Sequence, residues 1–464
     1  MSRYRIPVAA GVAAVLVGTG ALAAQAAVPN SYAPVDDRES FETVKARMEK
    51  ERPAVLARFQ RLLNERYDLS DKPVSGVTSS GRNKPIQGGV RVKLPKGVGS
   101  WTDLAAMAPG EVRNRDLWPA GFYPLPHDNQ AEGGMLFPKY HIDRVKAQDG
   151  RDLKRFDLDF GLPDRFLPEY PPAIYLTTRP DLGDVSKGQV VTLANYYELF
   201  NGVMNPKQLD GLRLLVSPTM QQQFNATADR RTDRPGTGVT CFDCHVNGHT
   251  NAATHLVGDI RPQSHRHRID TPTLRGVNVQ RLFGSQRALK TVEDFTEFEQ
   301  RAAYFDGDPA IAVKKGVNAL ERGNEVHDMA EVEELLDFPP APKLDLFGKL
   351  DPAKATPGEL HGQEIFFGKG QCSTCHTPPY YTDNSMHNLR TERFFKEKDI
   401  EGRLASADGP IKTFPLRGIK DSPPYLHDDR LLTLDDTVEF FNLVLGSRLS
   451  QPEKSDLVAF LRAL

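Results

Sequence analysis

The sequence predicts a mainly α-helical protein in which two copies of one unit follow an irregular, partly helical N-terminal region. The first observation behind this prediction is the pentapeptide Cys-x-x-Cys-His, which occurs twice. The second is that the residues around the two copies also repeat, and the third is that apolar residues recur at helical spacing. The 464 residues are enough for two to three domains with buried cores.

The two pentapeptides, at 241–245 and 372–376, use all four cysteines of the chain. In this pattern two thiols bond to the vinyl groups of one porphyrin, and the adjacent imidazole becomes the proximal iron ligand. The motifs therefore predict two covalently attached haem c groups. The predicted attachment residues are Cys241, Cys244, Cys372 and Cys375, and the predicted iron ligands are His245 and His376. A redox dithiol, a four-cysteine zinc site and disulfides are the alternatives, but none of them requires a histidine after each second cysteine.

The N-terminus has the pattern of a secretion signal. Arg3 and Arg5 precede an apolar stretch that ends in the small-x-small sequence Ala24-Gln25-Ala26. We therefore expect residues 1–26 to be a cleaved signal peptide, the mature protein to lie in the periplasm, and no membrane span to remain; an uncleaved anchor helix is the alternative. With 59 basic and 61 acidic residues, the chain is not expected to bind nucleic acid.

The chain divides into three predicted regions after the signal. Residues 27–186 form an N-terminal region of unknown role, with a helical pair over Phe41–Leu69 that breaks near Pro53. Residues 187–342 form the N-terminal haem lobe, and residues 343–464 form the C-terminal, cytochrome c-like haem lobe.

An internal repeat relates the two lobes. Predicted helices at Gln208–Leu215 and Glu359–Phe366 each lead toward a haem motif. Downstream, Leu274–Gln300 matches Leu416–Asn442 without a gap, with eight identities in 27 positions. A last helix with a capping box and an apolar stripe is predicted from Ser450, Glu453, Leu457, Phe460, Leu461 and Leu464.

Three further segments, Thr382–Asn388, Phe414–Gly418 and Pro424–Asp428, complete a resemblance to the bacterial di-haem cytochrome c peroxidases. Their superfamily includes MauG and, more distantly, the di-haem rubber oxygenases. The resemblance covers about Leu209 to Leu464. It implies that hydrogen peroxide or a similar small oxidant reacts at the N-terminal haem, while an electron-donor cytochrome or cupredoxin supplies the C-terminal haem. It also raises the prospect of a calcium ion between the lobes.

The resemblance also implies roles for individual residues. His245 would be the proximal ligand of the peroxidatic haem, and His376 would serve the electron-transfer haem. Arg275 and Arg417 match positions of the family near the haem propionates, where a guanidinium pairs with a carboxylate. The alternative is that both arginines are solvated surface charges.

The sixth iron ligands are where the sequence departs from the family. The place of the family's Met or Tyr ligand, about fourteen residues after His427, is Phe441, which cannot ligate iron. The second haem is therefore five-coordinate, or Met386, His387 or Tyr425 fills the place.

Four histidines, at positions 249, 255, 265 and 267, follow the first motif. His255 and His265 are the better candidates for a distal ligand, while His249 and His267 are weaker, and surface or propionate contacts are the alternative for all four.

Peroxide cleavage also needs a distal base. Glu299 lies where the repeat places Phe441, and is the first candidate for this base. Glu297 is the second, since its repeat partner is Glu439; a solvated helix face is the alternative for both. Ser285 stands where the family commonly has an inter-haem Trp.

Taken together, the residues favour a peroxidase-like, di-haem oxidoreductase. Two rivals remain: a MauG-like or oxygenase-like enzyme that oxidises a protein or organic substrate, and a di-haem electron-transfer cytochrome without peroxidase activity.

Overall fold

The computed structural model describes residues 94–119, 135–153, 162–218, 239–256, 268–302, 322–390 and 410–464, together with residues 394, 398–400 and 403–405 and isolated positions between 46 and 63. These residues are mainly helical, as predicted. The helices are α2 (Trp101–Ala106), α3 (Pro109–Asn114), α4 (Lys139–Asp149), α5 (Tyr196–Phe200), α6 (Pro206–Val216), α7 (Cys241–Cys244), α8 (Val292–Ala302), α10 (His327–Glu333), α11 (Pro357–Phe367), α12 (Leu434–Leu445) and α13 (Gln451–Ala463).

Short antiparallel strands accompany the helices. β1 (Met135–Leu136), β2 (Thr254–Leu256) and β3 (Arg268–Asp270) form one sheet, with Met135 opposite His255 and His255 opposite Ile269. β4 (Met386–Asn388) pairs with β7 (Pro410–Lys412), and β5 (Lys398–Ile400) pairs with β6 (Arg403–Ala405). Because all the described strands are so short, the packing of the helices determines the fold.

A glycine-mediated helix pair forms the centre of each lobe. In the first lobe, a Cβ on Gly211 of α6 would stand 1.8 Å from the Asp328 carbonyl oxygen of α10. In the second, a Cβ on Gly362 of α11 would stand 2.0 Å from the Asp456 carbonyl oxygen of α13. Both α6 and α11 begin with a capping box and a proline at the first turn. The two predicted helices before the haem motifs are therefore confirmed, and they pack in the same way.

The elements after each haem motif also correspond. Gly276 and Gly418 both have a left-handed backbone, with φ of 74° and 72°, and each precedes a 3-10 turn, η7 (Val277–Val279) or η12 (Ile419–Asp421). Single β-bridges then join Phe283 to Leu289 and Tyr425 to Leu431. Next come α8 and α12, each with a threonine whose side chain accepts from the backbone of its first turn. The spacing of the sequence repeat thus recurs in the backbone.

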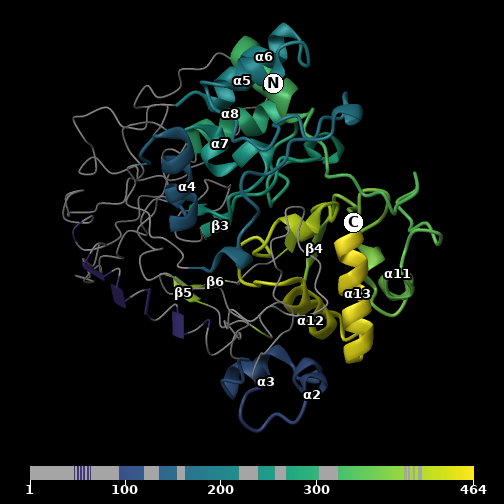
Figure 1. Cartoon of the computed structure of the whole chain (residues 1–464). Helices are drawn as coiled ribbons and strands as arrows, with labels where there is room; N and C mark the ends of the chain where they lie inside the picture. The colour runs from purple at the N-terminus through teal and green to yellow at the C-terminus, as the bar shows by residue number, and fades with distance from the viewer. Residues whose placement is uncertain are drawn as a thin grey trace, which may run out of the picture.

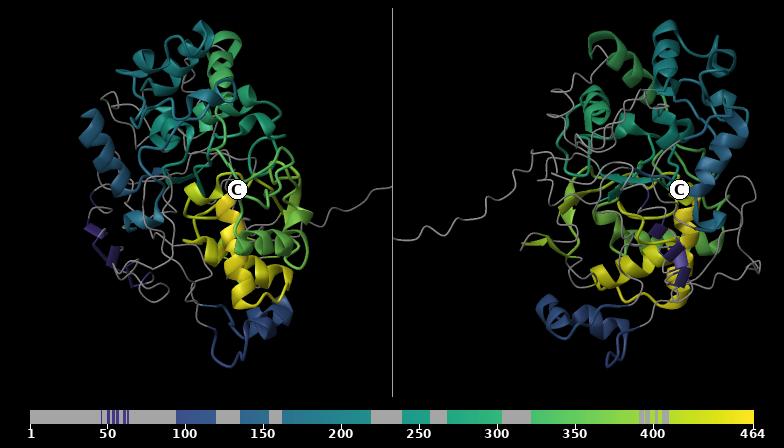
Figure 2. Two further views of the ribbon diagram at one scale, coloured as in Figure 1. Left: turned by 45° about the vertical axis from the view of Figure 1, so that its right-hand side comes forward. Right: turned by 90° about the vertical axis from the view of Figure 1, so that its left-hand side faces the viewer.

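The N-terminal region contributes to the core of both lobes. Leu104 of α2 and Val112 of α3 lie in the apolar core built by α11, α12 and α13, and Figure 1 shows α2 and α3 beside α12. Figures 1 and 2 show the teal first lobe above the yellow C-terminal helices in each view. Ile174 and Leu176 lie in the core of the first lobe although they precede residue 187. The border after residue 186 stays a prediction.

The two lobes are joined by hydrogen bonds of both main chain and side chains. The Asp270 amide donates to the His427 carbonyl at 2.8 Å, and the Lys412 amide donates to the Ser285 carbonyl at 3.0 Å. The Arg281 amide donates to the Asn384 side chain at 2.9 Å. These contacts tie the loops after the first motif to the loops after the second.

The last helix of the chain agrees with its prediction. The capping box of Ser450 and Glu453 is confirmed, and the apolar stripe of α13 is buried. The isolated described positions between 46 and 63 are helical, and they include Pro53, where the sequence predicted a break. The rest of Phe41–Leu69 lies outside the described residues, as do residues 1–26. Within the part of the chain that the structure describes, no helix is long and apolar enough to span a bilayer.

The tight contact at Gly211 predicts a specific cost of adding a methyl group. We expect Gly211→Ala to lower the free energy of unfolding by about 1–3 kcal/mol, because the methyl would overlap the Asp328 carbonyl and push α10 away. Gly110→Ala is the matched control: Gly110 is an exposed helical residue with open space around it. Denaturant unfolding of the three proteins measures the effect, and equal stability of the two variants would contradict it.

Candidate functional site

The first haem motif folds as one helical turn. Cys241–Cys244 form α7, which Thr240 and Asp243 cap reciprocally, and His245 follows as the C-cap residue. The Thr240 amide donates to Asp243 Oδ2 at 2.7 Å. A helical turn places two cysteines three residues apart on one side, as attachment to a single porphyrin edge requires.

The histidine of each motif is held by one ring nitrogen. His245 Nδ1 lies 2.9 Å from the Pro272 carbonyl oxygen, and His376 Nδ1 lies 2.8 Å from the Tyr381 carbonyl oxygen. Because a carbonyl oxygen only accepts, Nδ1 carries the hydrogen in both rings and Nε2 keeps its lone pair. This is the tautomer and support that a histidine ligand of a metal needs. Both residues therefore fit an iron ligand.

The cysteines do not fit the alternative chemistries. All four lie among the described residues; no disulfide joins them, and they do not gather in one cluster with metal-binding spacing. Burial raises the pKa of the Cys372 thiol to about 12 and also raises the pKa of Cys375. A reactive dithiol needs a lowered thiol pKa, so a thioredoxin-like role is disfavoured. The four-cysteine zinc site is disfavoured by the geometry.

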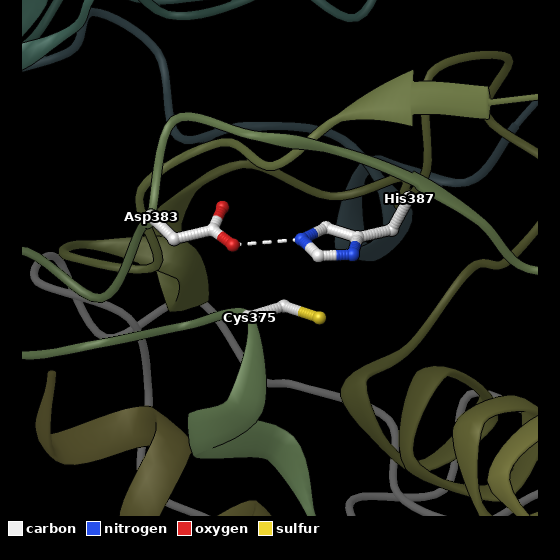
Figure 3. A group of neighbouring side chains, drawn as sticks. All are labelled: Cys375, Asp383 and His387. Carbon is white, nitrogen blue, oxygen red and sulfur yellow. Dashed lines mark hydrogen bonds and ion pairs between the residues drawn. The ribbon is translucent and has the colours of Figure 1, made fainter.

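Cys375 does lie close to two other donor groups, as Figure 3 shows. Its sulfur, a carboxylate oxygen of Asp383 and a ring nitrogen of His387 are all within 4.8 Å of one another. His387 Nε2 is 2.7 Å from Asp383 Oδ2, so this pair is complete without a metal ion. The mixed donor set does not match the oxygen ligands of calcium, and a calcium ion between the lobes stays a prediction.

The two repeat arginines have different surroundings. Arg275 is 6% exposed; its Nη2 donates to the Ala173 carbonyl at 2.6 Å, and its Nε is buried without a hydrogen-bond partner among the described residues. A buried cation with an unsatisfied donor calls for an anion, and a haem propionate fits. Arg417 is half-buried and donates to the carbonyls of Leu464 and Pro339, at 2.9 and 3.3 Å. The alternative of a solvated surface charge does not describe Arg275.

The candidate histidines of the first lobe have different surroundings. The ring nitrogens of His249 are both engaged: Nε2 donates to the Asp421 carbonyl at 2.8 Å, so Nδ1 accepts from the Thr273 hydroxyl at 2.8 Å. His249 therefore offers no lone pair to a metal. His255 lies in β2 at the centre of its sheet, and His265 and His267 lie outside the described residues.

The candidates for the sixth ligand of the second haem are also placed. Phe441 lies on α12 and packs against Phe440 with ring centroids 5.2 Å apart. Tyr425 is buried, and burial raises its pKa well above the ordinary value, which keeps the phenol protonated. Met386 lies on β4 opposite Lys412, and His387 is paired with Asp383.

The candidate distal acids lie on α8, against α10. Glu299 and Glu297 are partly buried. Next to them is Glu333 of α10, which the sequence analysis missed. Glu333 is 8% exposed and accepts from the Thr296 hydroxyl at 2.9 Å. Burial raises the pKa of Glu333 to about 8, and the charge of Glu299 adds to the rise although the Thr296 bond opposes it. Glu333 therefore holds a proton at neutral pH.

The second lobe has no acid at the matching place. The contacts of Gly211 and Gly362 align Asp328 with Asp456, and five residues further Glu333 aligns with Leu461. The repeat aligns Thr296 with Val438. Val438 and Leu461 are both buried in an apolar core. The signal for a buried acid in the sequence was the pair Glu333-Glu334 between Val332 and Leu335, of which Glu333 is the buried member.

The N-terminal region contacts the first motif directly, which the sequence also did not indicate. Arg151, just after α4, makes a two-pronged ion pair with Asp243, with Nη1 to Oδ2 at 2.8 Å and Nη2 to Oδ1 at 2.5 Å. His141 of α4 is buried between Phe137 and Tyr170, and burial lowers its pKa to about 4. Phe137 also packs with Cys244. α4 thus covers the first attachment turn.

The thiol and imidazole geometry makes haem attachment directly testable. We expect the double variants Cys241→Ala/Cys244→Ala and Cys372→Ala/Cys375→Ala each to lose one of two covalently held haems, because no thiol of that motif is left to form a thioether. The pyridine haemochrome spectrum per mole of protein and the intact mass would measure the loss. Ser373→Ala, which changes a spacer residue of the second motif, should keep both haems. An unchanged haem count in the cysteine variants would contradict the assignment.

The comparisons with known proteins agree with this site. No protein-family model matches the chain. A cytochrome-c peroxidase, IdrP2, of Denitromonas iodatirespirans is 32% identical over 158 residues, which are 26% of this chain and 43% of that protein. The methylamine utilization protein MauG of Methylorubrum extorquens is 27% identical over 119 residues, 22% of this chain and 33% of that protein.

These matches span less than half the length of either relative. Among solved structures, the diheme peroxidase BthA of Burkholderia thailandensis matches with a TM-score of 0.37 and 18% identity, over 56% of this chain and 86% of that chain. That value is too low to support an argument about the fold. The sequence matches, together with the two attachment motifs, support the resemblance of part of this chain to the bacterial di-haem cytochrome c peroxidases and MauG.

Proposed function

We propose that the chain is a periplasmic, di-haem, peroxidase-like oxidoreductase. In this proposal hydrogen peroxide or a similar small oxidant reacts at the haem held by His245. A donor cytochrome or cupredoxin supplies electrons through the haem held by His376. The observation that carries the proposal is the pair of motif imidazoles, each held through Nδ1 by a backbone carbonyl, in the tautomer that leaves the lone pair on Nε2.

The unequal polar groups of the two lobes support unequal roles. The first lobe has the partly buried Glu299 next to a protonated Glu333, whereas the matching positions of the second lobe, Phe441 and Leu461, cannot exchange a proton. Proton transfer is needed where peroxide is cleaved and not where an electron only passes. The acid pair therefore favours the first lobe as the site of peroxide chemistry.

In this proposal each side chain of the site has a separate role. Bound haem iron supplies the redox chemistry. Glu299 takes the proton from one peroxide oxygen and returns it to the other, and Glu297 is the second candidate for this step. Arg275, whose Nε has no hydrogen-bond partner among the described residues, would hold a propionate of the first haem, and Arg417 would hold a propionate of the second. α4 covers the attachment turn and excludes water from the side of Cys244.

The first test is spectroscopic. The purified ferric protein should show a high-spin haem in its absorption and EPR spectra, because one iron keeps an open face. Adding hydrogen peroxide should bleach or shift that signal. Two low-spin haems that peroxide leaves unchanged would instead identify a di-haem electron-transfer cytochrome and overturn the proposal.

The second test addresses the proton. Glu299→Gln should slow the reaction with peroxide by about 10²–10⁴-fold, since the amide keeps the shape but cannot carry the proton. Stopped-flow absorption measures the rate. Glu297→Gln is the matched control on the same helix and should retain the wild-type rate. If Glu297→Gln is slow and Glu299→Gln is normal, the roles of the two glutamates are exchanged; normal rates in both remove α8 from proton transfer.

A further inference from the structure

Lys412 is a buried lysine at the boundary between the two lobes. It is the last residue of β7 in the second lobe and is only 2% exposed. Its Nζ donates to Gln280 Oε1 at 2.9 Å, and its main-chain amide donates to the Ser285 carbonyl at 3.0 Å. Gln280 and Ser285 both belong to the first lobe. The side chain and the main chain of Lys412 therefore both reach across the boundary.

Two aromatic rings, one from each lobe, flank the amine. Lys412 Nζ is 5.5 Å from the centroid of Phe283 in the first lobe and 5.2 Å from the centroid of Phe414 in the second. Both distances are within the range of cation–π attraction. The carbonyl of Thr413, between Lys412 and Phe414, accepts from the Thr382 hydroxyl at 2.7 Å, and Thr382 directly follows the Tyr381 carbonyl that holds His376. The amine thus lies between the segments that build the two haem sites.

The amine has no anionic partner among the described residues that contact it. Gln280 is neutral, and on β4 the residue opposite Lys412 is Met386, while His387 of the same strand is paired with Asp383. The charged neighbour that acts on it is Arg287, which is also positive. Burial, and then the charge of Arg287, lower the pKa of Lys412 to about 7. A purely structural role would be served better by an apolar side chain of similar length.

We propose that Lys412 is a positioning residue that sets the electrostatic potential between the two lobes, and so fixes how electrons divide between the two haems. The inference rests on the two-haem function proposed above. A positive charge in a poorly solvated boundary favours the reduced, less positive form of a nearby redox centre. Loss of that charge lowers the reduction potential of the centre closest to it.

The test compares Lys412→Met with Lys412→Arg in the full, haem-loaded protein. At pH 6 the wild-type amine is charged, so Lys412→Met should change the reduction equilibrium of at least one haem tenfold or more, about 59 mV for one electron. At pH 9 the wild-type amine is neutral, so wild type and Lys412→Met should coincide. Lys412→Arg keeps its charge, and should match wild type at pH 6 and have a higher potential than wild type at pH 9. Spectroelectrochemical titration measures each potential.

Lys369→Met is the control, because it removes the same charge from an exposed lysine paired with Glu453 and should shift neither potential. Unchanged potentials in Lys412→Met at pH 6 would overturn the inference. A Lys412→Arg variant that behaves like Lys412→Met at pH 6 would show a packing effect and would also overturn it. The haem count and the peroxide reaction of the same samples test the proposed function separately. If the potentials follow this pattern but the protein does not react with peroxide, the role of Lys412 is supported and the peroxidase function is not.

Discussion

The hydrogen bond from the histidine Nδ1 of each motif to a backbone carbonyl is the interaction on which the rest of each lobe depends. It fixes both the tautomer and the plane of the ring, and the carbonyl comes from a loop that must return to the motif, at Pro272 in the first lobe and Tyr381 in the second. A loop holds an atom within a few tenths of an ångström only if its ends are anchored. The glycine-mediated helix pairs, α6 with α10 and α11 with α13, provide that anchorage.

The two lobes share these helix pairs and loops, but they differ in the side chains buried between the helices. Positions that hold Thr296 and Glu333 in the first lobe hold Val438 and Leu461 in the second. The polar pair of Thr296 and Glu333 stabilises the fold less than two apolar side chains of similar size. The reason is that burial disfavours the ionised carboxylate, which is the form the unfolded chain has at neutral pH. That cost is confined to one lobe. Buried polar groups that do not improve packing are typical of functional sites.

The sequence predicted the parts of this structure that depend on local interactions. The helices before each motif, the capping box at Ser450 and the repeat after Leu274 follow from spacing and capping residues alone. The parts that depend on distant contacts were not predictable. Nothing near Arg151 indicates its partner Asp243, and nothing near Lys412 indicates Gln280. The N-terminal region looked separate because it has no cysteine, yet Leu104 and Phe137 pack in different lobes.

His249 connects the first attachment turn to the second lobe. It stands four residues after His245 and uses one ring nitrogen for Thr273 in its own lobe and the other for Asp421 of the second lobe. A shift of the Cys241–His245 turn would therefore be passed through His249 to the Asp421 carbonyl of the second lobe. Such coupling is reciprocal. If reduction of one centre changes the ligand affinity of the other by some factor, ligand binding changes the reduction equilibrium of the first by the same factor. The imidazole of His249 is thus a direct link through which a change at the first attachment turn can act on the second lobe.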